Sequence, residues 1–193
     1  MKKGTILLAL MGLDIGGAET HAIVLAQHLQ NMGYKVVLAS NGGVYENQIK
    51  ANGIKHYHVN LTSKNPITVI QSLYRLCRLV KQEGINLIHA HARIPAFLCN
   101  IVSRYYHIHF ITTAHITFRS NLLLRWLSVW GEHTIAVSND IKEYLTSTFG
   151  VNPNQITVIY NGIDAEVFTP QVDYRPIIHE LGINENCRRI VCV

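Results

Sequence analysis

Cysteine is scarce in this chain of 193 residues, and its four copies are not spaced for a shared task. Cys77, Cys99, Cys187 and Cys192 form no CxxC pair and no regular ladder. A disulfide framework or a structural zinc site needs paired or regularly spaced cysteines, so neither is predicted. We expect the chain to reside in a reducing compartment, which for this protein means the cytoplasm.

Long apolar runs and charged residues are also in short supply. No stretch approaches the roughly 18 unbroken apolar residues of a membrane-spanning helix, and charged residues make up only 15% of the chain. Hydrophobic residues make up 48%, which is enough for a buried core and argues against disorder. Residues 1–12 mimic a secretory signal but lack a small-residue cleavage site, so no signal peptide is expected.

Acidic residues are nearly missing from the middle of the chain. Residues 61–110 contain six Lys or Arg and one acidic residue, Glu83, within a chain whose net charge is +5. Such an excess either faces an anionic partner or is an ordinary solvated surface. We expect no nucleic-acid partner.

Short apolar or β-branched runs alternate with segments of helical period throughout the chain. Seven runs are predicted to be strands: residues 5–10, 35–40, 54–59, 86–90, 109–114, 134–138 and 156–160. Near-continuous apolar runs of this kind suit strands buried on both faces of a parallel sheet. The pattern predicts a doubly wound, Rossmann-like α/β domain with a mainly parallel sheet of about seven strands.

The helical segments carry recognisable starts and stops. Apolar residues recur at helical spacing over 22–32, before Gly33, and over 69–80, before Gly84. Pro95 suits the first turn of a third helix, and Ser138 suits the N-cap of a fourth.

The end of the chain has a different character. The stretch 158–170, VIYNGIDAEVFTP, is rich in turn residues, and RPIIHELGI predicts a short helix after it. RRIVCV then begins what looks like another buried strand. The predicted organisation is a Rossmann-like domain over 1–160, a hinge with a short helix over 161–187, and the first strand of a second domain over 188–193.

Two adjacent glycines, Gly16 and Gly17, follow the first predicted strand and precede a helix. Bare backbone there lets a phosphate approach the free N–H groups and the positive end of the helix dipole. The spacing is not GxGxxG, and no Walker lysine follows, so neither a dinucleotide fingerprint nor a P-loop is indicated. A tight turn without a ligand is the alternative.

Several motifs in order make the chain resemble a known family. They are GGAE at 16–19, LIHAHA at 87–92, ITTAHI at 111–116, TIAVS at 134–138 and VIYNGID at 158–164. Together they resemble the N-terminal half of the retaining GT-B glycosyltransferases of family 4, over essentially the whole chain. The resemblance implies that the first domain binds the acceptor, and that a second domain holds the nucleotide-sugar donor.

The resemblance also implies roles for individual residues. Gly16 and Gly17 would contact the donor diphosphate. His115, after the strand 109–114, would be the catalytic histidine that hydrogen-bonds a hydroxyl of the transferred sugar; a purely structural histidine is the alternative. Asn161, Gly162 and Asp164 would form the interdomain hinge.

Other polar residues at predicted strand ends are candidates for binding the acceptor. They are Asp14, His91, Arg93 and Thr113; Arg93 suits a phosphate or carboxylate. The histidine pairs His56/His58, His89/His91 and His107/His109 could each share a strand face, yet no third metal ligand is signalled. We expect neither a metal nor another cofactor, because the nucleotide-sugar is a substrate.

The leading functional hypothesis is the acceptor-binding half of a retaining hexosyltransferase that acts on a glycan or lipid-linked acceptor in polysaccharide or lipopolysaccharide biosynthesis. The family's E-x7-E motif and its basic Arg/Lys pair for the diphosphate are lacking, so the chain is expected to be inactive alone. The alternative is a non-catalytic module that binds sugars or anions. The basic middle third, with Arg75 and Arg78 on one helix, suggests peripheral attachment to an anionic membrane at its inner face.

Overall fold

The computed structural model describes residues 3–118, 121–163, 165, 169, 173 and 175–184, without the side chains of Leu122, Leu123 and Trp126. The chain divides into two compact units, residues 1–160 and 161–193. The second unit contains the helix α7 (Arg175–Glu180), which coincides with the predicted short helix. The strand predicted over 188–193, with Cys187 and Cys192, lies outside the described residues.

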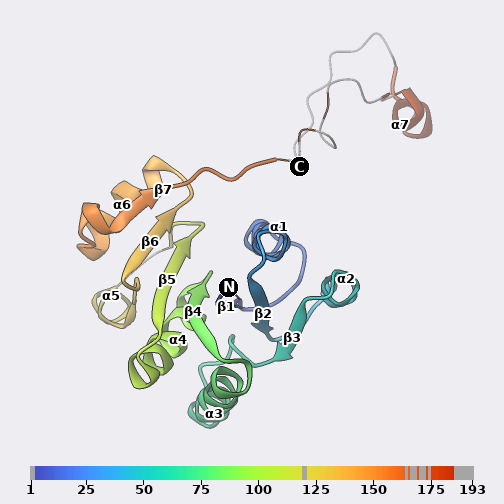
Figure 1. Ribbon diagram of the computed structural model, residues 1–193. Coiled ribbons are helices and arrows are strands. Elements are labelled where there is room, and N and C mark those ends of the chain that lie inside the picture. The colour runs from blue at the N-terminus through green and yellow to red at the C-terminus, as the bar shows by residue number, and fades with distance from the viewer. Residues whose placement is uncertain are drawn as a thin grey trace. The chain divides into compact units, whose positions relative to one another are not determined.

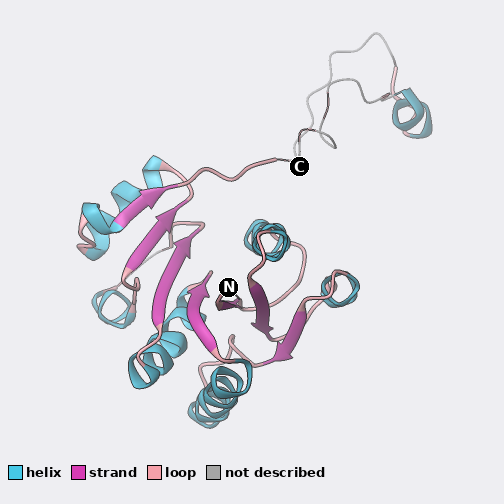
Figure 2. Cartoon of the chain, in the orientation of Figure 1, coloured by secondary structure: helices cyan, strands magenta, loops and turns pink. Residues whose placement is uncertain are grey.

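One sheet of seven strands forms the centre of the first unit (Figure 2), in the order β3-β2-β1-β4-β5-β6-β7. Every pairing in it is parallel. The strands are β1 (Thr5–Ala9), β2 (Lys35–Ser40), β3 (Lys55–His58), β4 (Ile85–Ala90), β5 (His109–Ala114), β6 (His133–Ala136) and β7 (Ile156–Val158). Each coincides with one of the predicted apolar runs to within one residue at its start, and the predicted fold class is confirmed.

Helices connect the strands and cover both faces of the sheet. They are α1 (Gly17–Asn31), α2 (Glu46–Ala51), α3 (Pro66–Glu83), α4 (Arg93–Tyr106), α5 (Leu122–Leu127), α6 (Asn139–Phe149) and a 3-10 turn, η1 (Pro153–Gln155). Figure 1 shows α1 and α2 on one face and α3 and α4 on the other. Right-handed crossovers produce this arrangement, because the chain winds in opposite directions from the centre of the sheet.

Local signals set the bounds of the long helices. The Asn65 side chain caps α3 by accepting from the Ile67 amide at 2.9 Å, and Gly84 ends the helix in the left-handed conformation, with φ of 64°. Ser138 caps α6 as predicted, accepting from the Ile141 amide at 3.2 Å. Pro95 lies in the first turn of α4, also as predicted. The six-residue helices α2 and α5 were not predicted, because so short a stretch shows little helical period.

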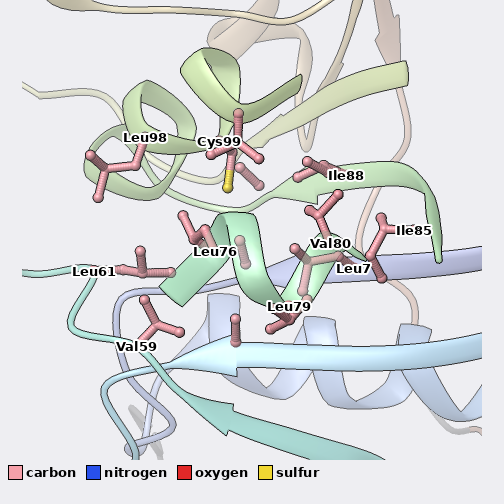
Figure 3. Packing of buried hydrophobic residues seen from close by; sticks show 14 of the residues in the cluster. Leu7, Val59, Leu61, Leu76, Leu79, Val80, Ile85, Ile88, Leu98 and Cys99 are labelled. Atoms are coloured by element: carbon pink, nitrogen blue, oxygen red, sulfur yellow. The ribbon is translucent and has the colours of Figure 1, made fainter. Parts of the chain in front are cut away.

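Successive side chains of the central strands pack alternately into two apolar layers, one on each face of the sheet. Leu7 of β1 packs in the cluster with Leu76 and Val80 of α3 (Figure 3), whereas its neighbour Leu8 belongs to the cluster under α1. This alternation is the strand period of two. Because both faces of β1 are buried, the strand reads as a continuous apolar run.

An ion cluster around the buried carboxylate of Glu83 links elements at the amino edge of the sheet, where the strands begin. Glu83, at the end of α3, has a side chain that is 2% exposed and lies 2.6 Å from Lys35 Nζ and 3.0 Å from Lys55 Nζ. The Tyr57 hydroxyl also donates to it through a short hydrogen bond. The hydrogen bonds from Lys35 and Tyr57 lower the pKa of Glu83 to about 2. The one acidic residue of the region 61–110 is therefore neutralised within the fold.

Candidate functional site at the carboxyl edge of the sheet

The two central strands, β1 and β4, run side by side and send the chain in opposite directions. After β1 the chain continues through α1 to β2, and after β4 it continues through α4 to β5. The amide of His91, just past β4, donates to the carbonyl of Ala9 at 3.0 Å. The strands thus stay paired up to the point at which their loops diverge. A switch point of this kind is where doubly wound sheets bind ligands.

Gly16 and Gly17 form the N-terminus of α1 on one side of the switch point. Gly16 is the N-cap residue, with an extended backbone (φ −176°, ψ 156°), and no described side chain caps the helix. Neither glycine has the positive φ that would demand glycine. A Cβ at Gly17 would have no described atom within 4 Å, whereas a Cβ at Gly16 would meet the Glu19 carboxylate. Nothing in the described chain therefore requires glycine at position 17.

Four histidine rings gather beside these glycines. The His91 Nδ1 and His115 Nε2 atoms are 3.3 Å apart, within hydrogen-bond distance. His21, which lies one helical turn after Gly17, has its ring centroid 5.2 Å from that of His115 and 5.8 Å from that of His91. His89 lies against His91, with centroids 4.2 Å apart. Residues from α1, β4 and β5 thus meet at one place.

Burial keeps the rings of His89, His91 and His115 neutral. It lowers the pKa of His89 to about 3 and that of His115 to about 4, and it lowers the pKa of His91 well below the ordinary value of 6.5. The neighbouring rings add to each shift, because a second positive charge would be repelled. Neutral rings can donate one hydrogen bond and accept another. His89 bonds Thr113, with Nε2 and Oγ1 2.7 Å apart.

Three buried polar atoms in this region have no hydrogen-bond partner among the described residues. They are Nε2 of His91, Nδ1 of His115 and one terminal nitrogen of Arg93. Buried polar atoms in folded proteins are almost always bonded, often to water or to a ligand. Their concentration at the switch point makes it the candidate binding site.

Arg93 begins α4, on the other side of the switch point from the glycines. Its guanidinium carbon lies 4.7 Å from the centroid of the Phe118 ring. The Tyr144 hydroxyl fixes the backbone of Phe118, since it accepts from the amide at 3.1 Å and also donates to the carbonyl. No described side chain caps α4 at Ala92. A cation at the positive end of a helix is unfavourable by itself, so this position favours an anionic ligand.

The remaining predicted site residues lie at different depths. Asp14 is exposed, and its Oδ1 accepts from the Val44 amide at 3.4 Å. Thr113 and His91 are only 3% and 4% exposed, so they lie beneath the surface that a large acceptor could touch. Asn161 and Gly162 open the second unit without regular structure, and Asp164 lies outside the described residues.

The histidine pairs differ from the prediction in one respect. His107 is the C-cap residue of α4, with a left-handed backbone (φ 54°), and β5 starts only at His109. The expectation that this pair could share a strand face is therefore wrong, because His107 caps the end of α4 and only His109 belongs to β5. In the ranges that the structure describes, no group of three His, Cys, Asp or Glu is placed to hold a metal ion.

Two contributors to the site were not predicted from the sequence. His21 lies on α1 and Phe118 follows β5, far from each other in the chain. Only the packing of α1 over the switch point brings His21 to His115, and only the Tyr144 contact brings Phe118 under Arg93. The sequence offered no signal for either, because both contacts join distant segments.

A separate groove of about 1030 Å³ lies at the amino edge of the sheet, away from the switch point. It is lined by the end of α4, the start of β5 and residues 127–132. None of the predicted site residues lines it. The switch point therefore remains the candidate site.

Solved structures with the same architecture define the class of protein. A glycosyltransferase from Rickettsia africae aligns with a TM-score of 0.80 at 21% identity, over 95% of this chain and 51% of that one. HepE of Anabaena, in complex with UDP-glucose, aligns with a TM-score of 0.77 at 16% identity, over 93% and 50%. At such identities the likeness concerns the fold: the described domain is a Rossmann-like half of the GT-B architecture.

Sequence relatives then identify the family. Residues 15–167 match Glycosyltransferase Family 4, and the chain belongs to this family. The gpi3 subunit of phosphatidylinositol N-acetylglucosaminyltransferase from Schizosaccharomyces pombe is 27% identical over 80% of this chain and 38% of its own length. The UDP-Gal:alpha-D-GlcNAc-diphosphoundecaprenol alpha-1,3-galactosyltransferase of Escherichia coli is 28% identical over 61% and 34%. The chain thus spans well under half of these relatives.

Proposed function

We propose that residues 1–160 are the acceptor-side domain of a retaining glycosyltransferase that moves a sugar from a nucleotide-sugar donor to a lipid-linked or glycan acceptor. The names of two relatives support this class of acceptor. One denotes transfer to phosphatidylinositol and the other transfer to a diphosphoundecaprenol-linked sugar. Both names describe lipids that carry phosphate.

The observation that carries the proposal is the open N-terminus of α1 at the switch point. Gly17 needs no glycine for its backbone or its packing, and a side chain there would fill the space before the first amides of the helix. In our proposal that space admits the donor diphosphate. The helix amides and dipole then stabilise the charge that builds up on the leaving diphosphate during transfer.

His115 is the proposed catalytic residue beside the transferred sugar. Its ring is neutral, and its Nδ1 has no partner among the described residues. A neutral ring can hydrogen-bond a sugar hydroxyl without adding charge next to a developing oxocarbenium ion. In the proposed mechanism it orients the sugar and takes no proton from it.

Arg93 and Asp14 are the proposed contacts of the acceptor. Arg93, at the N-terminus of α4, suits a phosphate of the acceptor, and exposed Asp14 suits a sugar hydroxyl. His91 and Thr113 are buried, so in this proposal they support the residues that contact the acceptor. No metal or other cofactor enters this proposal.

We also propose that Asn161, Gly162 and Asp164 are the hinge to a donor-binding domain, which residues 188–193 begin. The enzyme would work in the cytoplasm at the inner face of the membrane. Among the helices of the described residues, none is both long and apolar enough to span a bilayer. Attachment would be peripheral, through α3.

Substitution of Gly17 tests the central claim. In the complete enzyme, Gly17→Val should lower kcat at least tenfold, about 1.4 kcal/mol of transition-state stabilisation, because its side chain occupies the diphosphate's position. Folding should survive, since a Cβ at this position lies within 4 Å of no described atom outside the neighbouring helix backbone. Gly53→Ala, at a left-handed glycine outside the site (φ 70°), is the control for a substitution that strains the backbone only. Wild-type turnover by Gly17→Val would show that the glycines only form a turn.

The second candidate function is a module that binds sugars or anions without transfer. The unpartnered nitrogen of Arg93 favours anion binding whether or not transfer follows. Isothermal titration of the 193-residue chain with UDP-sugars and with lipid phosphates separates the two. Tight binding of a free sugar or anion, together with no turnover by the complete protein, would favour the module.

A further inference from the structure

The rings of His91 and His115 form a pair in which the tautomer of one ring fixes the tautomer of the other. One nitrogen of each ring faces the other ring, Nδ1 of His91 and Nε2 of His115, at 3.3 Å. Both rings are neutral, so each carries one proton, and one of the two facing atoms must donate while the other accepts. The two outer atoms, His91 Nε2 and His115 Nδ1, therefore always form one donor and one acceptor.

Burial decides which arrangement is favoured. The outer atoms have no partner among the described residues, so one of them carries an N–H that no described group accepts. An unsatisfied N–H costs most where the surroundings are most thoroughly buried. Both outer atoms are themselves buried, but His91 as a whole is 4% exposed whereas His115 is partly exposed, so solvent comes closer to the ring of His115. The proton is therefore better placed on the outer nitrogen of His115.

We propose that His91 is a positioning residue that donates from Nδ1 to Nε2 of His115 and so holds His115 in its Nδ1–H tautomer. His115 then offers a ligand a hydrogen-bond donor at Nδ1. The proposal concerns the tautomer alone. It rests on the proposed function only for the identity of the ligand, a hydroxyl of the transferred sugar.

The surroundings of His91 suit this task. Its backbone amide is anchored to Ala9 of β1 at 3.0 Å, and its ring lies against that of His89, which is itself bonded to Thr113. His21 packs across both rings of the pair from α1. Neither His91 nor His115 is ion-paired with a carboxylate of the described residues. The position of His91 is thus set by strand pairing and ring packing.

Substitutions at position 91 are expected to set the tautomer of His115 one way or the other. The amide of Asn places an N–H donor where Nδ1 stands, so His91→Asn should keep the Nδ1–H tautomer of His115. The carboxylate of Asp places an acceptor there, so His91→Asp should draw the His115 proton to Nε2. His91→Leu offers neither and should leave a mixture of tautomers. His28→Asn, on the exposed side of α1, is the matched control.

Ring-nitrogen NMR of the 193-residue chain reads the tautomer directly, from correlations of each ¹⁵N with the carbon-bound ring protons. We expect Nδ1–H for His115 in the wild type, in His91→Asn and in the control, and Nε2–H in His91→Asp. An Nε2–H tautomer in the wild type, or the same tautomer in the Asn and Asp variants, would overturn the proposal. The Asn and Asp variants carry the test even where His91→Leu fails to fold.

Steady-state kinetics of the complete enzyme separates this inference from the proposed function. We expect His91→Asp to lower kcat about tenfold or more with little change in the acceptor KM, and His91→Asn to recover most of that loss. A tautomer that switches as predicted while kcat stays constant supports the positioning role. That result would contradict the proposed contact between His115 and the sugar.

Discussion

At the switch point, three histidines have neutral rings at a pH at which an exposed histidine begins to titrate. The pKa of His89 is lowered to about 3 and that of His115 to about 4, and that of His91 is also lowered, in each case mainly by burial. The unfolded chain takes up protons on these rings below pH 6.5, whereas the folded chain does not. Their contribution to stability is therefore fully present above about pH 6.5 and is lost as the pH falls toward the folded-state values.

We predict that replacing one of these rings flattens the pH dependence of stability. His89→Gln keeps a polar atom near Thr113 and cannot be protonated. Between about pH 6 and 4.5, its unfolding free energy should fall less steeply than that of the wild type, by up to about 1.4 kcal/mol per pH unit. Urea unfolding at several pH values measures the slopes, with exposed His28→Gln as the control. Parallel slopes in wild type and His89→Gln would contradict the buried neutral ring.

At the scale of elements, the ion cluster around Glu83 joins the end of α3 to the starts of β2 and β3. Because the pKa of Glu83 is lowered to about 2, the contribution of this carboxylate is fully present above the unfolded-state value of about 4.3. It is lost as the pH falls through about 2. The lysine partners are 47% and 60% exposed, so solvent screening reduces the contribution of the two ion pairs to the unfolding free energy.

We predict that Glu83→Gln costs about 1.5–3 kcal/mol of unfolding free energy at pH 7, the range for hydrogen bonds to a charged group. The difference between wild type and variant should shrink between about pH 4.5 and 2. Comparing the two proteins at each pH cancels the histidine contribution. Glu143→Gln, at an exposed carboxylate on α6, is the control. A difference that stays constant down to pH 2 would disprove the assignment.

The surface of α3 is the element that we propose to meet the membrane. Arg75 and Arg78 are exposed there and line a shallow groove with Ile70 and Tyr74, whose exposed fractions are 66% and 69%. Since Glu83 is buried within its ion cluster, no acidic side chain of α3 or α4 faces solvent in the described structure. Apolar side chains between cations suit an anionic interface.

We predict weak, salt-reversible binding of the 193-residue chain to anionic vesicles. Each surface cation contributes about 1 kcal/mol within a Debye length of about 8–10 Å. Arg75→Glu/Arg78→Glu should therefore weaken binding at least about tenfold. Co-sedimentation with anionic and neutral vesicles at low and high salt measures it. The control Lys50→Glu/Lys142→Glu makes the same charge change on α2 and α6. Equal losses in both variants would show that only net charge matters.

At the scale of the whole molecule, the chain spans 38% of the length of its yeast relative and about half of the solved structures. In our proposal the donor is held by a second domain. We predict that the 193 residues alone transfer no sugar from any nucleotide-sugar donor, measured by release of the nucleotide and by labelled product. Turnover above that of a heat-inactivated sample would show that one domain suffices.

The order of elements could be predicted from the sequence, because it depends on local patterns. Short apolar or β-branched runs marked the strands, and Ser138 and Gly84 marked the bounds of helices. Family membership was also accessible, since its motifs are short and contiguous, such as GGAE at 16–19. The short helices α2 and α5 were missed, because two turns carry little periodicity and neither has a proline in its first turn, as α7 does at Pro176.

The assembly of the candidate site was decided by the tertiary structure. The sequence marked His91 and His115 separately, but their 3.3 Å contact exists only because β4 and β5 are neighbours in the sheet. Likewise, the pairing of Glu83 with two lysines requires β2 and β3 to begin at the edge of the sheet where α3 ends. Local propensity depends on neighbours along the chain, whereas hydrogen bonding and burial depend on neighbours in space. The order of strands in the sheet determines which residues become neighbours in space, and no local sequence pattern specifies that order.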